Sequence, residues 1–358
     1  MHVIAHLSTY GAENLVAQLA ARLDERGVEV SVLTVQDAPA TSRSAVFRGP
    51  VFSAGRRHSR DFAFFFRMVR AMRRWRPGIV HTHTHNGKYW GRLAAIVAGV
   101  PRIVHTEHNS DFQASLIEKL GNRVLHSATA RVVAFSEPHA QALARAERIS
   151  PKKIAIIANG IEQTVPLPRD AARARLQITA DDIAVFAIGR MQPVKNHRLA
   201  LLSLCDLPAT LAERAKLLIL GEGYEETALR KLARELGLQD RVSFCGFRPD
   251  ARELLSGADA LLVTSWNEAM PLCVIEAMAA RVPVVSTPWS GVEAVLPPSA
   301  GWISEGWAPQ QVARALARAL YDARNGSTRP DAARDLASLH YNISVTADRH
   351  AELYEALL

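Results

Sequence analysis

Short, continuously apolar runs alternate with segments of helical spacing along the whole chain, and this alternation restricts the fold more than any other feature. Runs such as Ala184–Ile188 and Pro283–Ser286 hold apolar residues at consecutive positions. Strands of a parallel sheet that is covered on both faces have this pattern. Segments such as Asn14–Arg26 and Thr227–Leu236 repeat apolar residues at helical spacing. The alternation therefore predicts an α/β fold built from βαβ units.

The number of such runs indicates two sheets rather than one, because open sheets rarely exceed about 10 strands. The expected strands are Val3–Leu7, Val28–Val35, Ile79–Thr82, Arg102–Thr106, Arg131–Phe135, Ile154–Ala158, Ala184–Ile188, Lys216–Leu220, Val242–Cys245, Ala260–Thr264 and Pro283–Ser286. A boundary is expected at Gly160–Arg169, which is rich in Pro and Gly. We expect two Rossmann-like domains facing each other across a cleft, over residues 1–163 and 164–340, and a final helix within 341–358.

Composition excludes several classes of protein. With 48% hydrophobic and 22% charged residues, the chain is neither fibrous nor disordered. It has no apolar run of about 18 residues and no signal-peptide pattern at its start. Its three cysteines, Cys205, Cys245 and Cys273, are too few for a disulfide framework and lack metal-ligand spacing. We expect a cytoplasmic protein, and a peripheral position on the inner face of the cell membrane stays open.

Candidate site residues follow the strands, since parallel sheets bind ligands beyond the carboxyl ends of their strands. Gly11 permits close backbone approach before a helix, whose N-terminus favours an anion. The G-x-G-x-x-G fingerprint is absent there, which disfavours a nicotinamide-dependent oxidoreductase. Arg190 and Lys195 flank a later loop that leads into a helix, an arrangement that suits a diphosphate. No Asp-x-Asp pair follows a strand, so we expect no metal ion at this site.

Two glutamates eight residues apart form the sharpest motif. A helix that begins near Pro271 places Glu276 about one turn inside it and Glu268 in the preceding loop. A carboxylate that accepts two hydroxyl hydrogen bonds can bind ribose or a hexose, and the backbone at Met270, Pro271 and Leu272 adds an anion-friendly helix start. Two glutamates on a helix usually face solvent, but their apolar neighbours argue against that interpretation here.

Histidines follow two strands of the first half. His81, His83 and His85 alternate and would share one face of a continuing strand. They could bind a metal ion, but no carboxylate or cysteine joins them, so a polar lining is the preferred interpretation. His108 follows the next strand, where it could hydrogen-bond a bound hydroxyl or stabilise developing charge. The alternative is a histidine satisfied within the protein.

These motifs together resemble retaining glycosyltransferases of the GT-B fold, family four, over nearly the whole chain. Glu268 and Glu276 are similar to the family's E-x7-E signature, and Arg190 with Lys195 resembles its phosphate-binding pair. Further similar elements are the turn Asn159-Gly160-Ile161, the segment Phe244-Cys245-Gly246-Phe247 and the tail Tyr354–Leu357. Two positions depart from the family pattern: Tyr10 precedes Gly11 where the family has a second glycine, and Arg281 stands where glycine is common.

The resemblance implies a sugar transfer from a nucleotide-sugar donor, a UDP- or GDP-sugar, without a metal ion or other cofactor. Arg190 and Lys195 would hold the diphosphate, and Glu276 the ribose. Glu268, Met270, Pro271 and Leu272 would hold the sugar, Phe247 and Gly11 would complete the donor contacts, and His108 would lie near the transferred sugar. The first domain would bind the acceptor and the second the donor, and the last helix would cross back to the first domain. Front-face transfer would retain the anomeric configuration while the two cations stabilise the leaving diphosphate.

The acceptor is the least specified partner. Ten arginines and one acid, Asp61, lie between Arg43 and Arg76, and aromatic residues are interleaved with them over 56–76. This segment predicts either an interfacial helix on an anionic membrane or a helix whose aromatic side is core. One side of the helix would carry Phe62, Phe65, Phe66, Val69, Met72 and Trp75. Nucleic acid is not an expected partner, because no recognition motif accompanies the charge. The leading hypothesis is a lipid-linked saccharide or cell-envelope glycan as acceptor. The alternatives are a soluble or sugar-phosphate acceptor and a non-catalytic nucleotide-sugar-binding module.

Overall fold

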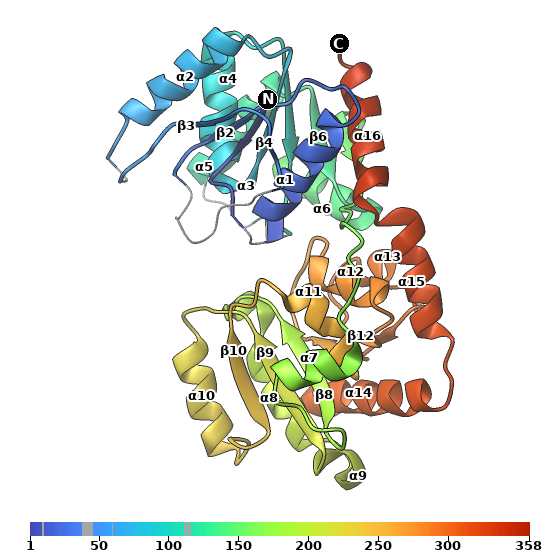
Figure 1. Cartoon of the computed structure of the whole chain (residues 1–358). Helices are drawn as coiled ribbons and strands as arrows, with labels where there is room; N and C mark the ends of the chain where they lie inside the picture. The colour runs from blue at the N-terminus through green and yellow to red at the C-terminus, as the bar shows by residue number, and fades with distance from the viewer. Residues whose placement is uncertain (9–10, 38–45, 59, 111, 113–115) are drawn as a thin grey trace. The chain divides into compact units, whose positions relative to one another are not determined.

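The computed structural model describes residues 1–8, 11–37, 46–58, 60–110, 112 and 116–358 of the 358-residue chain. The chain folds into two compact units (Figure 1). Unit 1 comprises Met1–Glu162 and Tyr341–Leu358, and unit 2 comprises Gln163–His340. The boundary between Glu162 and Gln163 therefore lies within the Pro- and Gly-rich segment Gly160–Arg169. Residues 341–358 belong to unit 1.

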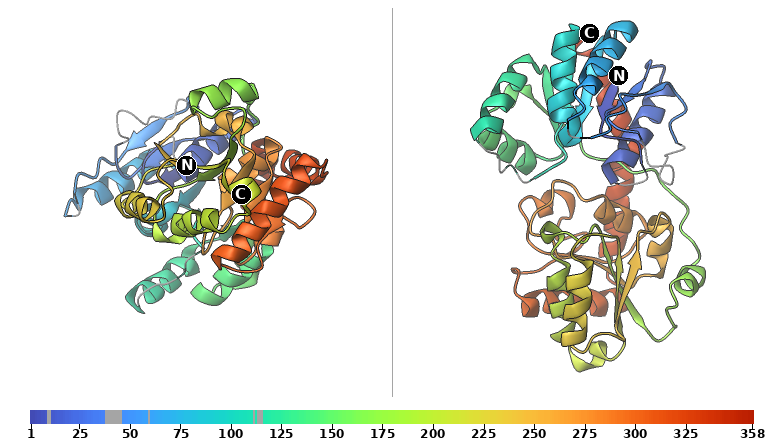
Figure 2. Two further views of the ribbon diagram at one scale, coloured as in Figure 1. Left: turned by 90° about the horizontal axis from the view of Figure 1, so that it is seen from below. Right: turned by 90° about the vertical axis from the view of Figure 1, so that its left-hand side faces the viewer.

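Unit 1 has a parallel sheet whose described strands follow the order β3-β2-β1-β4-β5-β6-β7. These strands are β1 (His2–Ile4), β2 (Val32–Thr34), β3 (Val51–Ser53), β4 (Ile79–His83), β5 (Arg102–Thr106), β6 (Arg131–Ala134) and β7 (Ile154–Ile156). The helices are α1 (Gly11–Asp24), α2 (Ala63–Trp75), α3 (Thr84–Asn86), α4 (Arg92–Ala98), α5 (Leu116–Ala128), α6 (Glu137–Glu147) and α16 (Ile343–Glu355), with shorter turns at η1 (Gly87–Gly91) and η2 (Pro151–Lys153). Right-handed crossovers place helices on both faces: α1 packs against α16, and α2 against α4 (Figures 1 and 2).

Unit 2 repeats this architecture with the order β10-β9-β8-β11-β12-β13, again parallel throughout its described strands. The strands are β8 (Ile183–Ile188), β9 (Ala215–Leu220), β10 (Val242–Gly246), β11 (Ala260–Val263), β12 (Val284–Ser286) and β13 (Trp302–Ile303). The helices are α7 (Arg169–Arg175), α8 (His197–Cys205), α9 (Ala209–Ala212), α10 (Glu226–Glu235), α11 (Ala251–Leu254), α12 (Leu272–Ala279), α13 (Val292–Val295), α14 (Pro309–Arg324) and α15 (Arg329–His340), with short turns η3 (Pro193–Lys195) and η4 (Leu255–Gly257). The direction of strand order reverses at β8 and β11, which is where ligands of such sheets bind.

The apolar runs become buried strands, as the sequence predicts. Every residue from Ile183 to Ala187 of β8 is buried, and the core of unit 2 includes Val185, Leu217 and Leu262 from three neighbouring strands. Burial on both faces removes all of these side chains from water, which explains why the runs are continuous rather than alternating. Each of the eleven expected runs overlaps a strand, and the two parallel sheets confirm the predicted fold class.

Two edge strands were not predicted, for different physical reasons. The β3 strand, Val51–Ser53, is exposed or half-buried along its length and pairs on one side only, with β2. It therefore needs no apolar run. The β13 strand has only two residues, Trp302 and Ile303, so it is too short to produce a periodic pattern.

The aromatic side of α2 differs from the predicted one. Its buried residues are Phe64, Met68, Val69 and Met72. Phe62 and Phe66 were expected on the same side, but they are 62% and 71% exposed. The buried side of the helix carries Phe64, Met68 and Met72 at a spacing of four residues. The predicted side of the helix was therefore wrong at Phe62 and Phe66.

A buried charge cluster joins three elements of unit 1. The Nζ atom of Lys88, in η1, donates to Glu107 at 2.6 Å and also to Glu147. The Nε2 atom of His126 lies 2.5 Å from the other Glu147 oxygen. All four side chains are at most 10% exposed. A buried carboxylate needs such partners, so Lys88 is expected to be essential to the packing between η1 and α6.

Residues 341–358 are bonded closely into unit 1. Ile161 and Asn342 form an isolated parallel bridge, and a β-carbon at Gly160 would lie 2.4 Å from the Asn342 carbonyl oxygen. Further along, the Tyr354 hydroxyl of α16 lies 2.5 Å from Nδ1 of His81 on β4. The resemblance implied that the last helix crosses back to the first domain, and α16 packs there, against α1.

Candidate functional site

Three loops at the carboxyl ends of β8, β9 and β10 are held together by backbone hydrogen bonds. The amide of Met191 donates to the Glu222 carbonyl at 2.9 Å, and the amide of Gly221 donates to the Gly246 carbonyl at 2.8 Å. A β-carbon at Gly221 would lie 2.1 Å from the Gly189 carbonyl oxygen, and its φ of +152° also favours glycine. The Gly221–Gly223 loop thus supports the loop after β8, on which Arg190 is exposed.

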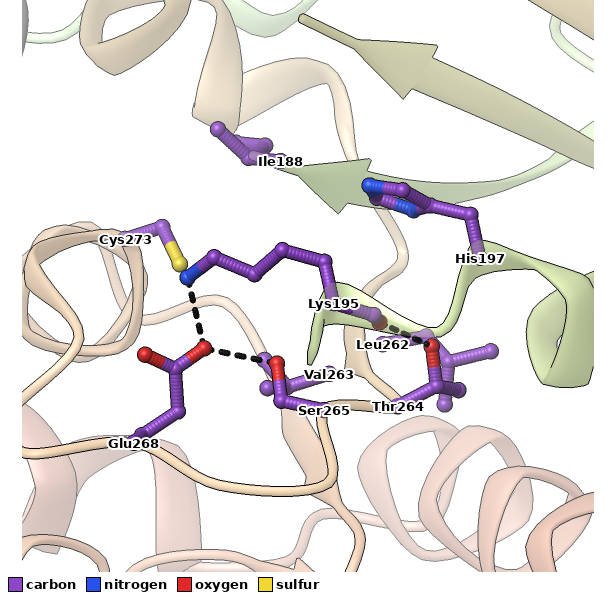
Figure 3. Close-up of a pocket in the computed structure, with 9 residues that line it drawn as sticks. All are labelled: Ile188, Lys195, His197, Leu262, Val263, Thr264, Ser265, Glu268 and Cys273. Carbon is purple, nitrogen blue, oxygen red and sulfur yellow. Dashed lines mark hydrogen bonds and ion pairs between the residues drawn. The ribbon is translucent and has the colours of Figure 1, made fainter. Parts of the chain in front are cut away.

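Lys195 and Glu268 form the centre of the candidate site (Figure 3). The Nζ atom of Lys195 donates to Oε1 of Glu268 at 2.6 Å, and the Ser265 hydroxyl donates to the same oxygen at 2.6 Å. Lys195 ends the η3 turn after β8, whereas Ser265 and Glu268 follow β11. The reversal of strand order between β8 and β11 therefore brings together a cation and a carboxylate that are 73 residues apart.

The backbone around Lys195 is fixed from the β11 side. The Thr264 hydroxyl donates to the carbonyls of Lys195 at 3.2 Å and Asn196 at 2.9 Å, and the Trp266 amide donates to the Val194 carbonyl at 2.9 Å. Burial by itself would lower the pKa of Lys195, but the Glu268 carboxylate outweighs it and the pKa is raised. The ammonium group is therefore charged and held in place before any ligand arrives.

The second glutamate lies on α12, as the sequence predicts. Pro271 precedes the first helical residue, Leu272, and Glu276 lies one turn further on. Its carboxylate pairs with a residue that sequence reasoning missed: Arg252 of α11 donates to Oε1 of Glu276 from Nε at 3.0 Å and from Nη2 at 2.8 Å. Glu268 and Glu276 thus have separate cationic partners, which no spacing rule in the sequence indicated.

The remaining predicted residues of unit 2 lie around this cluster. The Phe247 amide donates to the Glu222 side chain at 3.3 Å. Met270 and Pro271 are buried beside the start of α12, whereas Leu272 is half-buried. The structure therefore brings Lys195 and Glu268 into direct contact and places the others on the neighbouring loops of the same sheet edge.

Two of the pocket residues that the sequence did not predict have a strongly shifted pKa. His197 lines the pocket with Lys195, is 3% exposed, and has no hydrogen-bond partner at either ring nitrogen among the described residues. Burial lowers its pKa to about 4, so the ring is neutral at pH 7. Burial likewise raises the pKa of the Cys273 thiol to about 12, so this thiol is not a nucleophile at neutral pH.

The candidate residues of unit 1 are Gly11 and His108. Gly11 is the first residue of α1, whereas Tyr10 lies outside the described residues. The Nε2 atom of His108 lies 3.2 Å from Nδ1 of His83, and Nε2 of His83 lies 2.9 Å from Nδ1 of His2. Burial lowers the pKa of His108 to about 4. The His108 ring is thus a neutral hydrogen-bonding group oriented by His83.

The three alternating histidines do not share one environment. His81 and His83 are buried in β4, but the strand ends at His83 and the exposed His85 lies in α3. His2 of β1 takes its place, and ligand atoms of His2, His81 and His83 lie within 4.8 Å of one another. These atoms already bond one another or protein hydroxyls, and the rings of His2 and His83 are stacked at 12° rather than directed at one point. The expected trio of His81, His83 and His85 is therefore not assembled.

No helix within the described ranges has the length and apolar character needed to cross a membrane.

Comparison with known proteins places this architecture in a family. The family profile described as glycosyl transferases group 1 matches residues 168–334, and the profile described as glycosyltransferase family 4 matches residues 9–164. The D-inositol 3-phosphate glycosyltransferase of Mycobacteroides abscessus is 30% identical over 322 residues, which cover 79% of this chain and 70% of the relative. The enzyme of the same name from Acidothermus cellulolyticus is 29% identical and covers 87% of this chain and 78% of the relative.

Solved structures show the same fold. Anabaena Alr3699/HepE, whose crystal structure was solved in complex with UDP-glucose, matches with a TM-score of 0.82 at 19% identity, over 99% of this chain and 100% of that one. The two parallel sheets match this GT-B architecture along their whole length. The chain therefore belongs to glycosyltransferase family 4 and has the GT-B fold.

Proposed function

We propose that this glycosyltransferase moves a hexose-type sugar from a UDP- or GDP-sugar to an acceptor hydroxyl with retention of the anomeric configuration. The observation that carries the proposal is the Lys195–Glu268 pair at the point where the strand order reverses. A charged ammonium beside a carboxylate offers one group for a diphosphate and one for sugar hydroxyls. The family resemblance supplies the expectation of retention.

The chemistry assigned to each residue follows from its contacts. When a diphosphate binds, it replaces Glu268 as the partner of Lys195, and the exposed Arg190 adds a guanidinium fork. Glu268, still held by Ser265, is then free to accept hydrogen bonds from the sugar. Both cations stabilise the charge that develops on the leaving diphosphate, so we propose that neither a metal ion nor another cofactor is required.

The acceptor side is assigned to unit 1, where His108 follows β5. A neutral His108 held by His83 can exchange hydrogen bonds with an acceptor or sugar hydroxyl. The acceptor proton would pass to the departing diphosphate, as the front-face mechanism implies. The unit therefore supplies orientation rather than a nucleophile.

For the acceptor itself, we propose a small phosphorylated polyol. The support comes from the relatives of 29% and 30% identity, which are named D-inositol 3-phosphate glycosyltransferases. This choice reverses the order suggested by the sequence alone, which favoured a lipid-linked acceptor.

A lipid-linked acceptor remains a second candidate because of one surface. The exposed Phe62, which directly precedes α2, and the exposed Phe66 of α2 follow helical spacing with Arg70 and Arg73. Arg73 also donates to the Val97 carbonyl of α4 at 2.9 Å. On α4, Leu93 and Ile96 are also exposed. Apolar side chains surrounded by arginines suit an anionic lipid surface, where this face would dock peripherally.

Donor binding is tested first, by isothermal titration with UDP, GDP and ADP. Lys195→Ala should weaken the preferred nucleoside diphosphate about 10-fold or more, because a charge-assisted hydrogen bond is lost. Lys231→Ala, which removes an exposed lysine of α10, is the matched control. Unchanged affinity in Lys195→Ala would refute the site, and absence of binding by any nucleotide would refute the proposed function. Binding of a nucleotide without any sugar transfer would favour the non-catalytic module.

The proposed acceptor and the proposed retention of configuration are tested by an assay of the reaction product. The wild type is incubated with the donor that binds and either inositol 3-phosphate or glycolipid in anionic vesicles. We expect product with the phosphorylated polyol, with the donor's anomeric configuration read from proton coupling constants. Product from the vesicles alone, together with salt-sensitive co-sedimentation that Phe66→Ser abolishes, would replace the first acceptor with the second.

A further inference from the structure

Arg252 and Glu276 form an ion pair within unit 2, where α11 packs against α12 (Figure 1). Their side chains are 18% and 14% exposed, so the pair is largely shielded from water. Two donor atoms of Arg252, Nε and Nη2, lie within hydrogen-bond distance of the same oxygen, Oε1, at 3.0 and 2.8 Å. Within the described residues, Oε1 is thus doubly engaged and Oε2 is the oxygen left for another donor.

We propose that Arg252 is a positioning residue that fixes the Glu276 carboxylate so that Oε2 accepts the ribose 2′-hydroxyl, and that it thereby makes the site selective for ribonucleotide over 2′-deoxyribonucleotide donors. The inference rests on the proposed function and on the role that the family resemblance implies for Glu276, which is to hold the ribose. It goes further because it assigns a role to Arg252 and identifies the 2′-hydroxyl as the group that the site recognises.

The reason is geometric. A glutamate side chain has several rotamers, and an unheld carboxylate must lose that freedom when a ligand binds. Arg252 lies on a different helix and donates two hydrogen bonds to Oε1 of Glu276. The direction of Oε2 is therefore fixed before a ligand binds. An acceptor fixed in this way rejects a ligand that lacks the matching hydroxyl, because its buried polar group is then left unpaired.

One ion pair on the surface of unit 2 lacks this shielding. Arg314 and Glu305 are paired at 3.1 Å, but their side chains are 63% and 75% exposed. Such a pair is screened by water and contributes little to the orientation of either group. Arg314→Ala is therefore the matched control for Arg252→Ala.

The test measures affinities for UDP, 2′-deoxy-UDP, GDP and 2′-deoxy-GDP by isothermal titration of the full chain. Wild type should prefer the ribonucleotide about 10-fold or more, as expected for a hydroxyl bonded to a charged acceptor. Arg252→Ala should weaken the ribonucleotide about 10-fold and the deoxynucleotide much less, so that the preference collapses. Arg252→Lys should restore part of it, and Arg314→Ala should behave as wild type. In turnover assays, Arg252→Ala should raise the donor KM and leave kcat nearly unchanged.

Outcomes that overturn the inference are distinct from those that overturn the proposed function. If Glu276→Ala loses the ribonucleotide preference but Arg252→Ala keeps it, only the role of Arg252 is wrong. Equal weakening of both nucleotides in Arg252→Ala would mean that its charge acts on the phosphates and not through Glu276. Failure of wild type to bind any of the four would refute the proposed function itself. The melting temperature of each variant is compared with wild type, and Arg252→Lys, which keeps the charge and most of the volume, decides the question if Arg252→Ala does not fold.

Discussion

Lowering the pH from about 7.5 to about 5.0 should destabilise unit 1 more than unit 2, because unit 1 buries more neutral imidazoles. His105 and His350 are 1% and 4% exposed in unit 1, and burial lowers the pKa of each from 6.5 to about 4. In unit 2, burial lowers the pKa of His197 to the same value.

The direction follows from where protons bind. Between about pH 6.5 and pH 4, the unfolded chain binds a proton at each of these rings and the folded chain does not, so stability is complete above this window and falls through it. Between about pH 7.5 and pH 5.0, each ring accounts for a loss of about 2 kcal/mol. His105 and His350 together account for a loss of about 4 kcal/mol in unit 1, and His108, with the same pKa of about 4, adds to that loss. His197 accounts for a loss of about 2 kcal/mol in unit 2. The buried carboxylates Glu107 and Glu147 have lowered pKa values, so their contribution is lost only at lower pH.

The assay is urea unfolding at both pH values, followed by pulse hydrogen exchange. Peptides from β4 and β5 report on unit 1, and peptides from β8 and β9 report on unit 2. We expect the unit 1 midpoint to fall further than the unit 2 midpoint. His350→Gln should reduce the pH dependence of unit 1 by about 2 kcal/mol, and His85→Gln, at an exposed position, serves as the control. Equal shifts in both units, or a pH dependence in His350→Gln equal to that of wild type, would refute the reasoning.

Three further predictions concern stability. Gly221→Ala should destabilise unit 2 by about 2 kcal/mol or more, because its β-carbon meets a carbonyl oxygen at a positive φ, whereas Gly121→Ala in α5 has open space and should be neutral or stabilising in thermal melts. Lys88→Met should cost about 3–5 kcal/mol in urea unfolding, since it leaves two buried carboxylates without their cation, and a loss below 1 kcal/mol would contradict the buried cluster. Tyr354→Phe should cost about 1 kcal/mol by removing the hydroxyl bonded to His81, and a melting temperature equal to that of wild type would show that this bond contributes nothing.

The sheets could be predicted from the sequence because burial on both faces imposes a pattern on every central strand. The run at Ala184–Ile188 is apolar because β8 is covered on both faces and its side chains are buried. The edge strand β3 could not be found in this way, since a strand with one neighbour and a solvated face needs no such run. The error at Phe62 and Phe66 has a related cause: several aromatic residues fit either side of α2, and only tertiary packing on α4 decides between them, whereas Val69 and Met72 of the predicted side are buried.

The site was partly predictable for a different reason. The positions of Lys195 and Glu268 follow from the rule that loops at a reversal of strand order hold the ligand. Their partners do not follow from any local rule. Arg252 lies 24 residues before Glu276 and Ser265 only three before Glu268, yet nothing in either spacing marks the bond that forms. Hydrogen bonds between side chains of separate elements can be identified only once the packing of those elements is known.

Unit 2 is one continuous segment of the chain, and in the sequence it lies between the two segments that make up unit 1. Synthesis of unit 1 therefore begins before that of unit 2 and is completed after it. Residues 163–340 emerge from the ribosome as one stretch and contain every strand of their sheet. Unit 1 begins to emerge earlier but lacks the helix that packs on α1 until Ile343–Glu355 appears. Since domains generally fold as they emerge, the nascent chain is expected to complete its second unit while the first still exposes the face that α16 covers. A chaperone that recognises exposed apolar helices would therefore engage α1 throughout the translation of unit 2.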